Sequence, residues 1–118
     1  MSYTIKKQFT FSASHILTDL PEGHQCGRLH GHNYIVEVVL QDTELNAVGF
    51  VRDYGELKFI KEYIDAQLDH RHLNDVLICN PTAENMARTL YHTLKPTYAQ
   101  LVAVSISETP ATWATYHA

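Results

Sequence analysis

Two histidines separated by a glycine are the first residues whose spacing points to chemistry. His30-Gly31-His32 opens a run of alternating apolar residues that is typical of a β-strand. Residues two apart on a strand project from the same face, so both imidazoles can bind one ion. Histidine is also abundant, with eight in 118 residues, and most of them fall between His15 and His72. This clustering predicts a metal site.

His15 is the candidate third ligand, because it ends an earlier alternating stretch on its apolar face. If the two strands are antiparallel neighbours, His15 meets His30 and His32. Zinc binds imidazole nitrogens, and catalytic zinc sites commonly have three protein ligands and one open position. The alternative is that these are core or loop histidines with local hydrogen bonds. We expect a metal site, because a same-face pair and a third histidine coincide.

Two cysteines lie far apart in the chain, at Cys26 and Cys79. Cys26 precedes His30 by four residues in a glycine-flanked loop, so we expect it close to the metal, where a thiolate can act as a general base. The alternative is an inert buried cysteine. We expect Cys79 to pack as an apolar residue.

Two acidic residues also stand out from the pattern. Asp69 precedes His70, and a carboxylate beside an imidazole can orient it for proton exchange; the alternative is a histidine that interacts with a helix C-terminus. Glu108 continues a face of valines and isoleucine, where an unpaired charge would be costly. We expect it to bind either a planar ligand with two adjacent N–H donors or an arginine or backbone group.

Alternation of apolar and polar residues predicts the strands. The expected strands are 3–15, 30–40, 100–109 and 112–117, with a possible short strand at 48–51.

Apolar residues at helical spacing predict two helices. The first is expected after Asp53 and Glu56, which resemble a capping box, and continues to Leu68. The second is expected to begin at Asn80-Pro81, an N-cap followed by a first-turn proline, and to end before Pro96. The segment 69–79 between them is expected to be a loop.

This order of elements predicts an α+β fold in a single domain spanning residues 1–118, with an antiparallel sheet covered on one face by a helical pair. Ile35 and Val39 lie on the second face of the sheet, which suggests that other subunits cover it.

The composition, 45% hydrophobic and 19% charged, is that of a soluble globular domain. The net charge is -4 and no lysine or arginine cluster occurs, which argues against nucleic acid as a partner. No apolar run approaches the length of a membrane span, and no signal peptide is apparent at the start. We therefore expect a cytoplasmic protein without a membrane partner.

Six segments occur in an order and spacing shared with a known family. They are Phe11-Ser12-Ala13-Ser14-His15, Cys26-Gly27-Arg28-Leu29-His30-Gly31-His32-Asn33, Leu68-Asp69-His70, Leu73-Asn74-Asp75, Asn80-Pro81-Thr82-Ala83-Glu84-Asn85 and Ser107-Glu108-Thr109-Pro110. Together they resemble the 6-pyruvoyl-tetrahydropterin synthase superfamily, and most closely its bacterial 6-carboxy-5,6,7,8-tetrahydropterin synthase branch. The resemblance covers nearly the whole chain.

The resemblance implies a tunnelling fold, which is an antiparallel four-stranded sheet under two helices, assembled into a homohexamer of two stacked trimers with sites at subunit interfaces. It also implies a zinc-dependent carbon–carbon lyase in queuosine precursor biosynthesis. The implied substrate is 7,8-dihydroneopterin triphosphate, and the products are 6-carboxytetrahydropterin, acetaldehyde and triphosphate.

The resemblance also implies roles for individual residues. Zn²⁺ would be bound by His15, His30 and His32, Cys26 would be the general base, and Asp69 and His70 would relay protons, although His72 is an alternative to His70. Glu108 would anchor the pterin through its 2-amino and N3–H edge, with further substrate contacts from Arg28, Thr82 and Glu84.

Three alternatives remain open at this point. The first is a 6-pyruvoyl-tetrahydropterin synthase, although the short spacing from Cys26 to His30 resembles the 6-carboxy branch. The second is a zinc-hydroxide hydrolase or hydratase, which would leave Cys26 and Glu108 without a role. The third is a non-catalytic zinc- or pterin-binding module.

Overall fold

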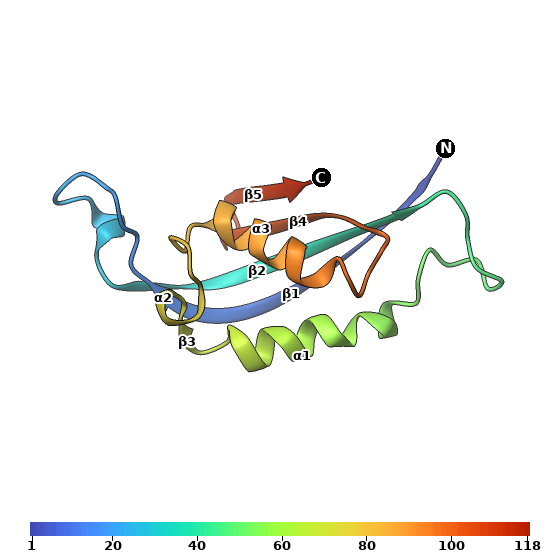
Figure 1. The fold of residues 1–118 in the computed structure, drawn as a ribbon, viewed down its shortest axis with the longest axis horizontal. Coiled ribbons are helices and arrows are strands. Elements are labelled where there is room, and N and C mark those ends of the chain that lie inside the picture. The colour runs from blue at the N-terminus through green and yellow to red at the C-terminus, as the bar shows by residue number, and fades with distance from the viewer.

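One five-stranded sheet forms the centre of the molecule (Figure 1), and the computed structural model describes all residues 1–118. The strand order is β3-β1-β2-β4-β5. β1 pairs with β3 in parallel, and every other neighbouring pair is antiparallel. The strands are β1 Tyr3–His15, β2 His30–Asp42, β3 Arg71–His72, β4 Leu101–Thr109 and β5 Thr112–His117.

The expectation of four antiparallel strands is therefore wrong, because the sheet is mixed and has a fifth strand. β3 lies within the segment 69–79 that was expected to be a loop, and it pairs only with Ala13 and Ser14 of β1. A strand of two residues carries no periodicity that a sequence could show. The structure supports the expected α+β class.

The short strand expected at 48–51 is also absent. The side-chain oxygen of Asn46 accepts hydrogen bonds from the backbone N–H groups of Val48, Gly49 and Phe50. Gly49 has a φ of 104°, a conformation open mainly to glycine. A local asparagine turn thus replaces the strand, since the side chain satisfies the N–H groups that a ladder would use.

Three α-helices are present where two were expected: α1 Lys58–Gln67, α2 Leu73–Val76 and α3 Ala83–Leu94. The additional helix, α2, is a single turn inside the expected loop 69–79. Asp53 does not cap α1, because its side chain accepts from the N–H of Gly55 in a 3₁₀ turn that precedes the helix.

The N-cap of α3 is Thr82 rather than the expected Asn80. The Thr82 hydroxyl accepts a hydrogen bond of 3.1 Å from the N–H of Asn85. The side-chain amide of Asn85 in turn donates to the carbonyl of Asn80 at 2.9 Å. Asn80 and Pro81, the expected N-cap and first-turn proline, therefore precede the helix. The hydrogen bond from the N–H of Asn85 to the Thr82 hydroxyl identifies Thr82 as the N-cap.

The core lies between one face of the sheet and the two long helices. α3 packs against β4 and β5, and α1 lies along β1 (Figure 1). Inward side chains of all three elements join one buried cluster, for example Phe11, Val36, Ile64 and Leu90. Burial of each such side chain stabilises the fold by about 1.5–3 kcal/mol, so the packing of the helices on the sheet fixes the positions of the strand ends.

The pairing of β1 with β2 positions the predicted site. It runs from Tyr3 opposite Asp42 to His15 opposite His30. At the histidine end the strands approach closely, since a Cβ on Gly31 would lie 3.2 Å from the carbonyl oxygen of Ala13. The alternation of β1 and β2 therefore delivers His15 and His30 to the same face and the same end of the sheet.

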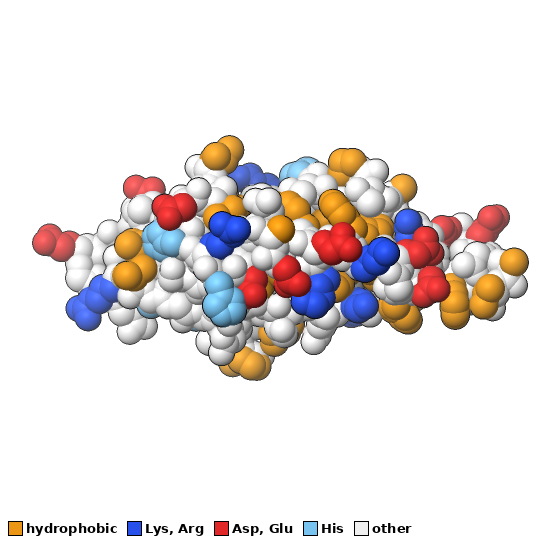
Figure 2. Space-filling model, turned by 90° about the horizontal axis from the view of Figure 1, so that it is seen from below, with side chains coloured by type: hydrophobic (Ala, Val, Ile, Leu, Met, Phe, Trp, Pro, Cys, Tyr) orange, Lys and Arg blue, Asp and Glu red, His pale blue; other side chains and the backbone are white.

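The surface carries charges of both signs. On the face shown in Figure 2, lysine and arginine side chains are interspersed with aspartate and glutamate. This is consistent with the absence of a basic patch in the sequence. None of the helices is both long and apolar enough to cross a lipid bilayer.

Candidate metal centre and active site

Four side chains from three strands converge at one end of the sheet. They are His15 of β1, His30 and His32 of β2, and Glu108 of β4, and their donor atoms all lie within 4.8 Å of one another. The antiparallel pairing of β1 and β2 brings His15 to the histidine pair, as the sequence predicted. The fourth member, Glu108, for which a planar ligand, an arginine or a backbone group was expected as the partner, lies against the histidines through its Oε2 atom.

Hydrogen bonds to backbone carbonyls determine which nitrogen of each ring carries a proton. Nδ1 of His15 donates to the carbonyl of Pro81 at 2.8 Å, and Nδ1 of His30 donates to the carbonyl of Arg28 at 2.7 Å. In a neutral imidazole the other nitrogen, Nε2, then carries a lone pair. These two Nε2 atoms lie 2.9 Å apart. Two lone pairs at that distance require a cation between them, either a proton or a metal ion.

The Nε2 atom of His32 is buried and has no hydrogen-bond partner. It lies 3.0 Å from Oε2 of Glu108, which is also 3.5 Å from Nε2 of His15, so these contacts are electrostatic rather than aligned hydrogen bonds. Two ligands on a tetrahedral zinc ion are about 3.3 Å apart, given bonds of about 2.0–2.1 Å. The donor set and its spacing therefore fit a divalent metal ion.

Burial keeps the histidines in the form that binds metal. His15 is fully buried, and desolvation is the main cause that lowers the pKa of His15 and of His32. Both rings are thus neutral at pH 7, as metal ligation requires. Burial also raises the pKa of Tyr34, whose hydroxyl lies 3.2 Å from Nδ1 of His15.

Cys26 lies in a 3₁₀ turn, Gln25–Gly27, in the loop that precedes β2, and it is half-buried. Its N–H donates to the ring of His24 at 3.0 Å, and its carbonyl accepts from the N–H of Leu17 at 3.1 Å. Its sulfur is not among the four converging donors. Backbone hydrogen bonds therefore define the loop, and the thiol lies outside the group of four donor atoms.

Asp69 and His70 form a direct pair, with Oδ2 of Asp69 2.9 Å from Nδ1 of His70. The other oxygen of Asp69 accepts from the N–H of Ser12 at 2.9 Å. This backbone hydrogen bond, followed by the one from His70, lowers the pKa of Asp69. His70 has a φ of 58°, which a residue other than glycine rarely adopts, and its side chain is 81% exposed. The pair therefore presents an oriented imidazole to the outside of this chain.

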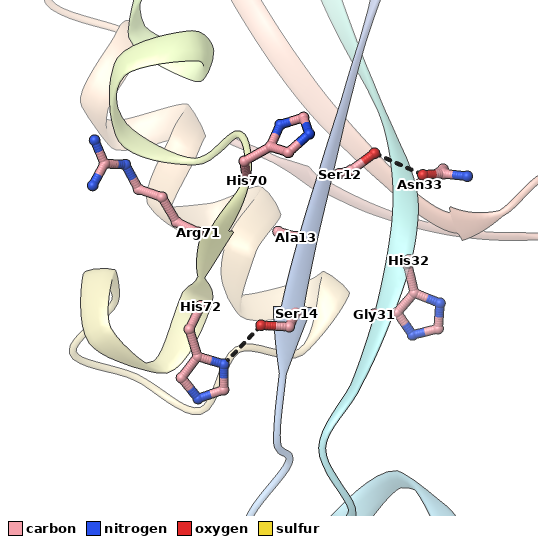
Figure 3. A pocket seen from close by; sticks show the side chains of 9 residues that line it. All are labelled: Ser12, Ala13, Ser14, Gly31, His32, Asn33, His70, Arg71 and His72. Atoms are coloured by element: carbon pink, nitrogen blue, oxygen red, sulfur yellow. Dashed lines mark hydrogen bonds between the residues drawn. The ribbon is translucent and has the colours of Figure 1, made fainter.

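His70 borders a shallow hollow of about 440 Å³ where β1, β2 and β3 meet (Figure 3). There the ring of His72 lies 2.9 Å from the hydroxyl of Ser14, and the hydroxyl of Ser12 donates to Asn33 at 2.6 Å. His72 is thus bonded to a serine, and only His70 is paired with Asp69. Ser12 and Ser14 were not among the predicted site residues, although their alternation with Phe11 and Ala13 could have placed them on this face.

The remaining predicted substrate contacts are spread over the chain. Glu84 borders a second hollow, of about 130 Å³, together with Glu108 and Trp113. The Thr82 hydroxyl accepts the capping hydrogen bond of α3. Arg28 contributes its carbonyl to His30, and its side chain is exposed. Trp113 is a residue that the sequence analysis did not single out.

Sequence comparison decides the family. The sequence profile described as 6-pyruvoyl tetrahydropterin synthase matches residues 4–118. The chain belongs to the 6-pyruvoyl tetrahydropterin synthase family. It is 30% identical over 131 residues to the 6-carboxy-5,6,7,8-tetrahydropterin synthase of Bacillus subtilis, covering 98% of this chain and 85% of that one. It is 42% identical over 59 residues to the dihydroneopterin monophosphate aldolase of Pyrococcus furiosus, covering 50% and 49% of the two chains.

A solved structure of this family has the same fold. The 6-pyruvoyl tetrahydropterin synthase of Caenorhabditis elegans matches with a TM-score of 0.87 at 28% identity, covering 100% of this chain and 96% of that one. Because the match covers the whole of this chain, the similarity in fold includes the strands that carry the four metal-binding candidates.

Proposed function

We propose that this protein is a zinc-dependent 6-carboxy-5,6,7,8-tetrahydropterin synthase in queuosine precursor biosynthesis. It would convert 7,8-dihydroneopterin triphosphate to 6-carboxytetrahydropterin, with release of acetaldehyde and triphosphate. The observation that carries the proposal is the convergence of three imidazole Nε2 atoms beside Glu108. Membership of the family and the similarity to the Bacillus subtilis protein of that name support the choice of reaction.

In this proposal His15, His30 and His32 hold the zinc ion. When bound, zinc supplies Lewis acidity toward substrate hydroxyls and stabilises negative charge on the substrate side chain. The carbonyls of Pro81 and Arg28 orient two of the ligand rings, because each accepts the Nδ1 proton and leaves Nε2 free to bind.

Proton transfer is assigned to Cys26 and to the Asp69–His70 pair. Cys26 would take a proton from the substrate side chain as general base. Asp69 would keep His70 in one orientation and tautomer, a role supported by the hydrogen bonds that hold both carboxylate oxygens. Glu108 would bind the 2-amino and N3–H edge of the pterin, with Arg28, Thr82 and Glu84 as further contacts.

Assembly is part of the proposal. His70 projects outward from the β1 edge, whereas the metal candidates lie at the end of the sheet on its helix-covered face. A homohexamer with active sites at subunit interfaces would let His70 of one subunit serve the metal centre of another. We place the assembled enzyme in the cytoplasm, with no nucleic-acid or membrane partner.

The test is incubation of the zinc-loaded protein with 7,8-dihydroneopterin triphosphate, followed by mass spectrometry of the pterin and an assay for acetaldehyde. The proposal predicts a 6-carboxypterin product and acetaldehyde, and loss of both after treatment with a chelator. Consumption of the substrate without acetaldehyde would contradict it.

A second candidate is another reaction at the same site. The similarity to the Pyrococcus furiosus aldolase, over half of each chain, favours side-chain cleavage of a dihydroneopterin phosphate. The same mass spectrum distinguishes an aldolase product, a 6-pyruvoyl product and a 6-carboxy product. Binding of a pterin without turnover would instead indicate a non-catalytic zinc- or pterin-binding module.

A further inference from the structure

The hollow of about 130 Å³ beside Glu108 lies between the start of α3 and the β4–β5 hairpin. Its lining combines two carboxylates, those of Glu84 and Glu108, with the carbon surface of Ala83, Ile106 and Trp113. It adjoins the metal candidates directly, because Oε2 of Glu108 is shared with them. A molecule seated in this hollow would therefore reach the histidine cluster.

A β-bulge places Trp113 next to Glu108. Ile106 pairs with Ala114 and Thr109 pairs with Thr112, so Ser107 and Glu108 of β4 together face the single residue Trp113 of β5. The hydroxyl of Ser107 donates to the carbonyl of Thr109 within the irregular segment. Bulges occur next to active sites, where they redirect a side chain. This one makes the indole the cross-strand neighbour of the carboxylate.

The indole is held in place without being part of the core. Its Nε1–H donates to the carbonyl of Pro110 at 3.3 Å, so its polar edge is used within its own hairpin. The side chain is nevertheless 44% exposed, whereas Ala114 and Tyr116 of the same strand pack against the core. Trp113 therefore lines the hollow with a flat apolar ring whose orientation is held by a hydrogen bond.

The carboxylates restrict what can occupy this surface. Oε1 of Glu108 takes part in neither of the contacts that Oε2 makes with His15 and His32, so it is free to accept N–H groups. A flat heteroaromatic ring with adjacent N–H donors matches a carboxylate beside an aromatic face. A neutral or cationic ring also suits two acidic side chains better than an anion does.

We propose that Trp113 is a specificity-determining residue that forms the aromatic wall of the ring subsite, with the ligand's heteroaromatic ring packed against the indole while its N–H edge meets Glu108. This inference rests on the proposed function and adds a residue to it. Trp113 contacts the ring and not the side chain that reacts, so it contributes binding rather than chemistry.

The test compares wild type, Trp113→Ala, Trp113→Phe and His117→Ala, the last being an exposed control on the same strand. Affinity for neopterin, an oxidised pterin probe, is measured by calorimetry on the zinc-loaded protein, and kcat and KM are measured with 7,8-dihydroneopterin triphosphate. Loss of one aromatic stacking partner predicts about ten-fold weaker neopterin binding and a similar rise in KM for Trp113→Ala, with kcat unchanged. Trp113→Phe should restore binding, because it keeps an aromatic face.

Two results would overturn the inference. The first is a Trp113→Ala variant that binds neopterin as wild type does. The second is a loss of affinity accompanied by a changed mass in light scattering, which would assign Trp113 to a subunit contact. Failure of the proposed function looks different, because it shows in wild type itself, either as no consumption of the triphosphate or as consumption without acetaldehyde. Far-ultraviolet circular dichroism, which does not depend on the single tryptophan that two of the variants lack, checks that each variant is folded.

Discussion

The state of the imidazoles is set by single hydrogen bonds. Pro81 and Arg28 contribute only backbone carbonyls, yet these carbonyls leave the lone pairs of His15 and His30 directed at each other. The buried Nε2 of His32 also lacks a hydrogen-bond partner. The three Nε2 atoms therefore form a group of hydrogen-bond acceptors with no proton donor among them. Such an arrangement is unfavourable without a cation, which is the physical reason to assign a metal here.

Replacement of a ligand tests this assignment at the residue scale. His32→Ala should lower zinc content from one ion per chain to a small fraction, because loss of one of three imidazoles removes much of the chelate. Zinc is measured by atomic absorption after dialysis. His117→Ala, an exposed histidine far along β5, is the matched control and should retain zinc. Equal zinc content in both variants would refute the assignment.

Cysteine provides the second test at this scale. Cys26→Ala should keep its zinc, since the sulfur is not among the converging donors. It should lose turnover by a factor of about 10²–10⁴, the usual contribution of a general base. Cys79→Ala is the control, because the hydrogen bond of that thiol goes to the Thr89 hydroxyl, at 3.9 Å, and not to the histidine cluster. A Cys26→Ala variant with full activity would remove the thiol from the mechanism.

At the scale of elements, strand alternation was enough to predict the metal candidates. The apolar residues of β1 and β2 define which face is buried, and His15 and His30 continue those faces to the strand ends. The two histidines come together if the strands are antiparallel neighbours, and β1 and β2 are paired in this way. The position of Glu108 was predicted in part, because its face could be read from Val104 and Ile106 but the bulge after Ile106 could not.

Short elements were beyond prediction because they depend on contacts distant in sequence. β3 exists because Arg71 and His72 meet Ala13 and Ser14 across the chain. The cap of α3 was misassigned by two residues, since Asn80 and Thr82 are both suitable capping residues and only the hydrogen bond to Asn85 distinguishes them. The loop that carries Cys26 has no periodic signal either, so the approach of its sulfur to the metal ligands stays a prediction.

The cap itself is testable by stability. Thr82→Ala should lower the free energy of unfolding by about 1 kcal/mol, because the N–H of Asn85 loses its acceptor. Thr82→Ser retains the hydroxyl and should restore most of the difference. Urea denaturation of the two variants and wild type measures this. Equal stability of the alanine and serine variants would show that the hydroxyl does not cap the helix.

For the whole molecule, metal binding should be linked to stability and to pH. Zinc that binds only the folded chain raises the midpoint of thermal unfolding, so a chelator should lower it. Burial lowers the folded-state pKa of His15 and His32, so the unfolded chain binds protons more readily. Stability from these neutral rings is therefore present above about pH 6.5 and lost as the pH falls through the lower folded-state pKa values.

The expected result is a midpoint that falls on acidification from pH 7.5, with a zinc-dependent increment that shrinks in parallel because zinc competes with protons for the same nitrogens. Differential scanning fluorimetry with and without chelator measures both effects. A zinc increment that does not change with pH would mean that the ion binds elsewhere than at the histidines.

We propose that three imidazoles from two paired strands hold one zinc ion while Cys26 stays out of the coordination sphere. X-ray absorption spectroscopy of the zinc-loaded protein measures this directly. We expect nitrogen and oxygen ligands at about 2.0–2.1 Å, with the multiple-scattering signal of three histidine rings and no sulfur. A zinc–sulfur distance of about 2.3 Å, or fewer than three imidazoles, would contradict it.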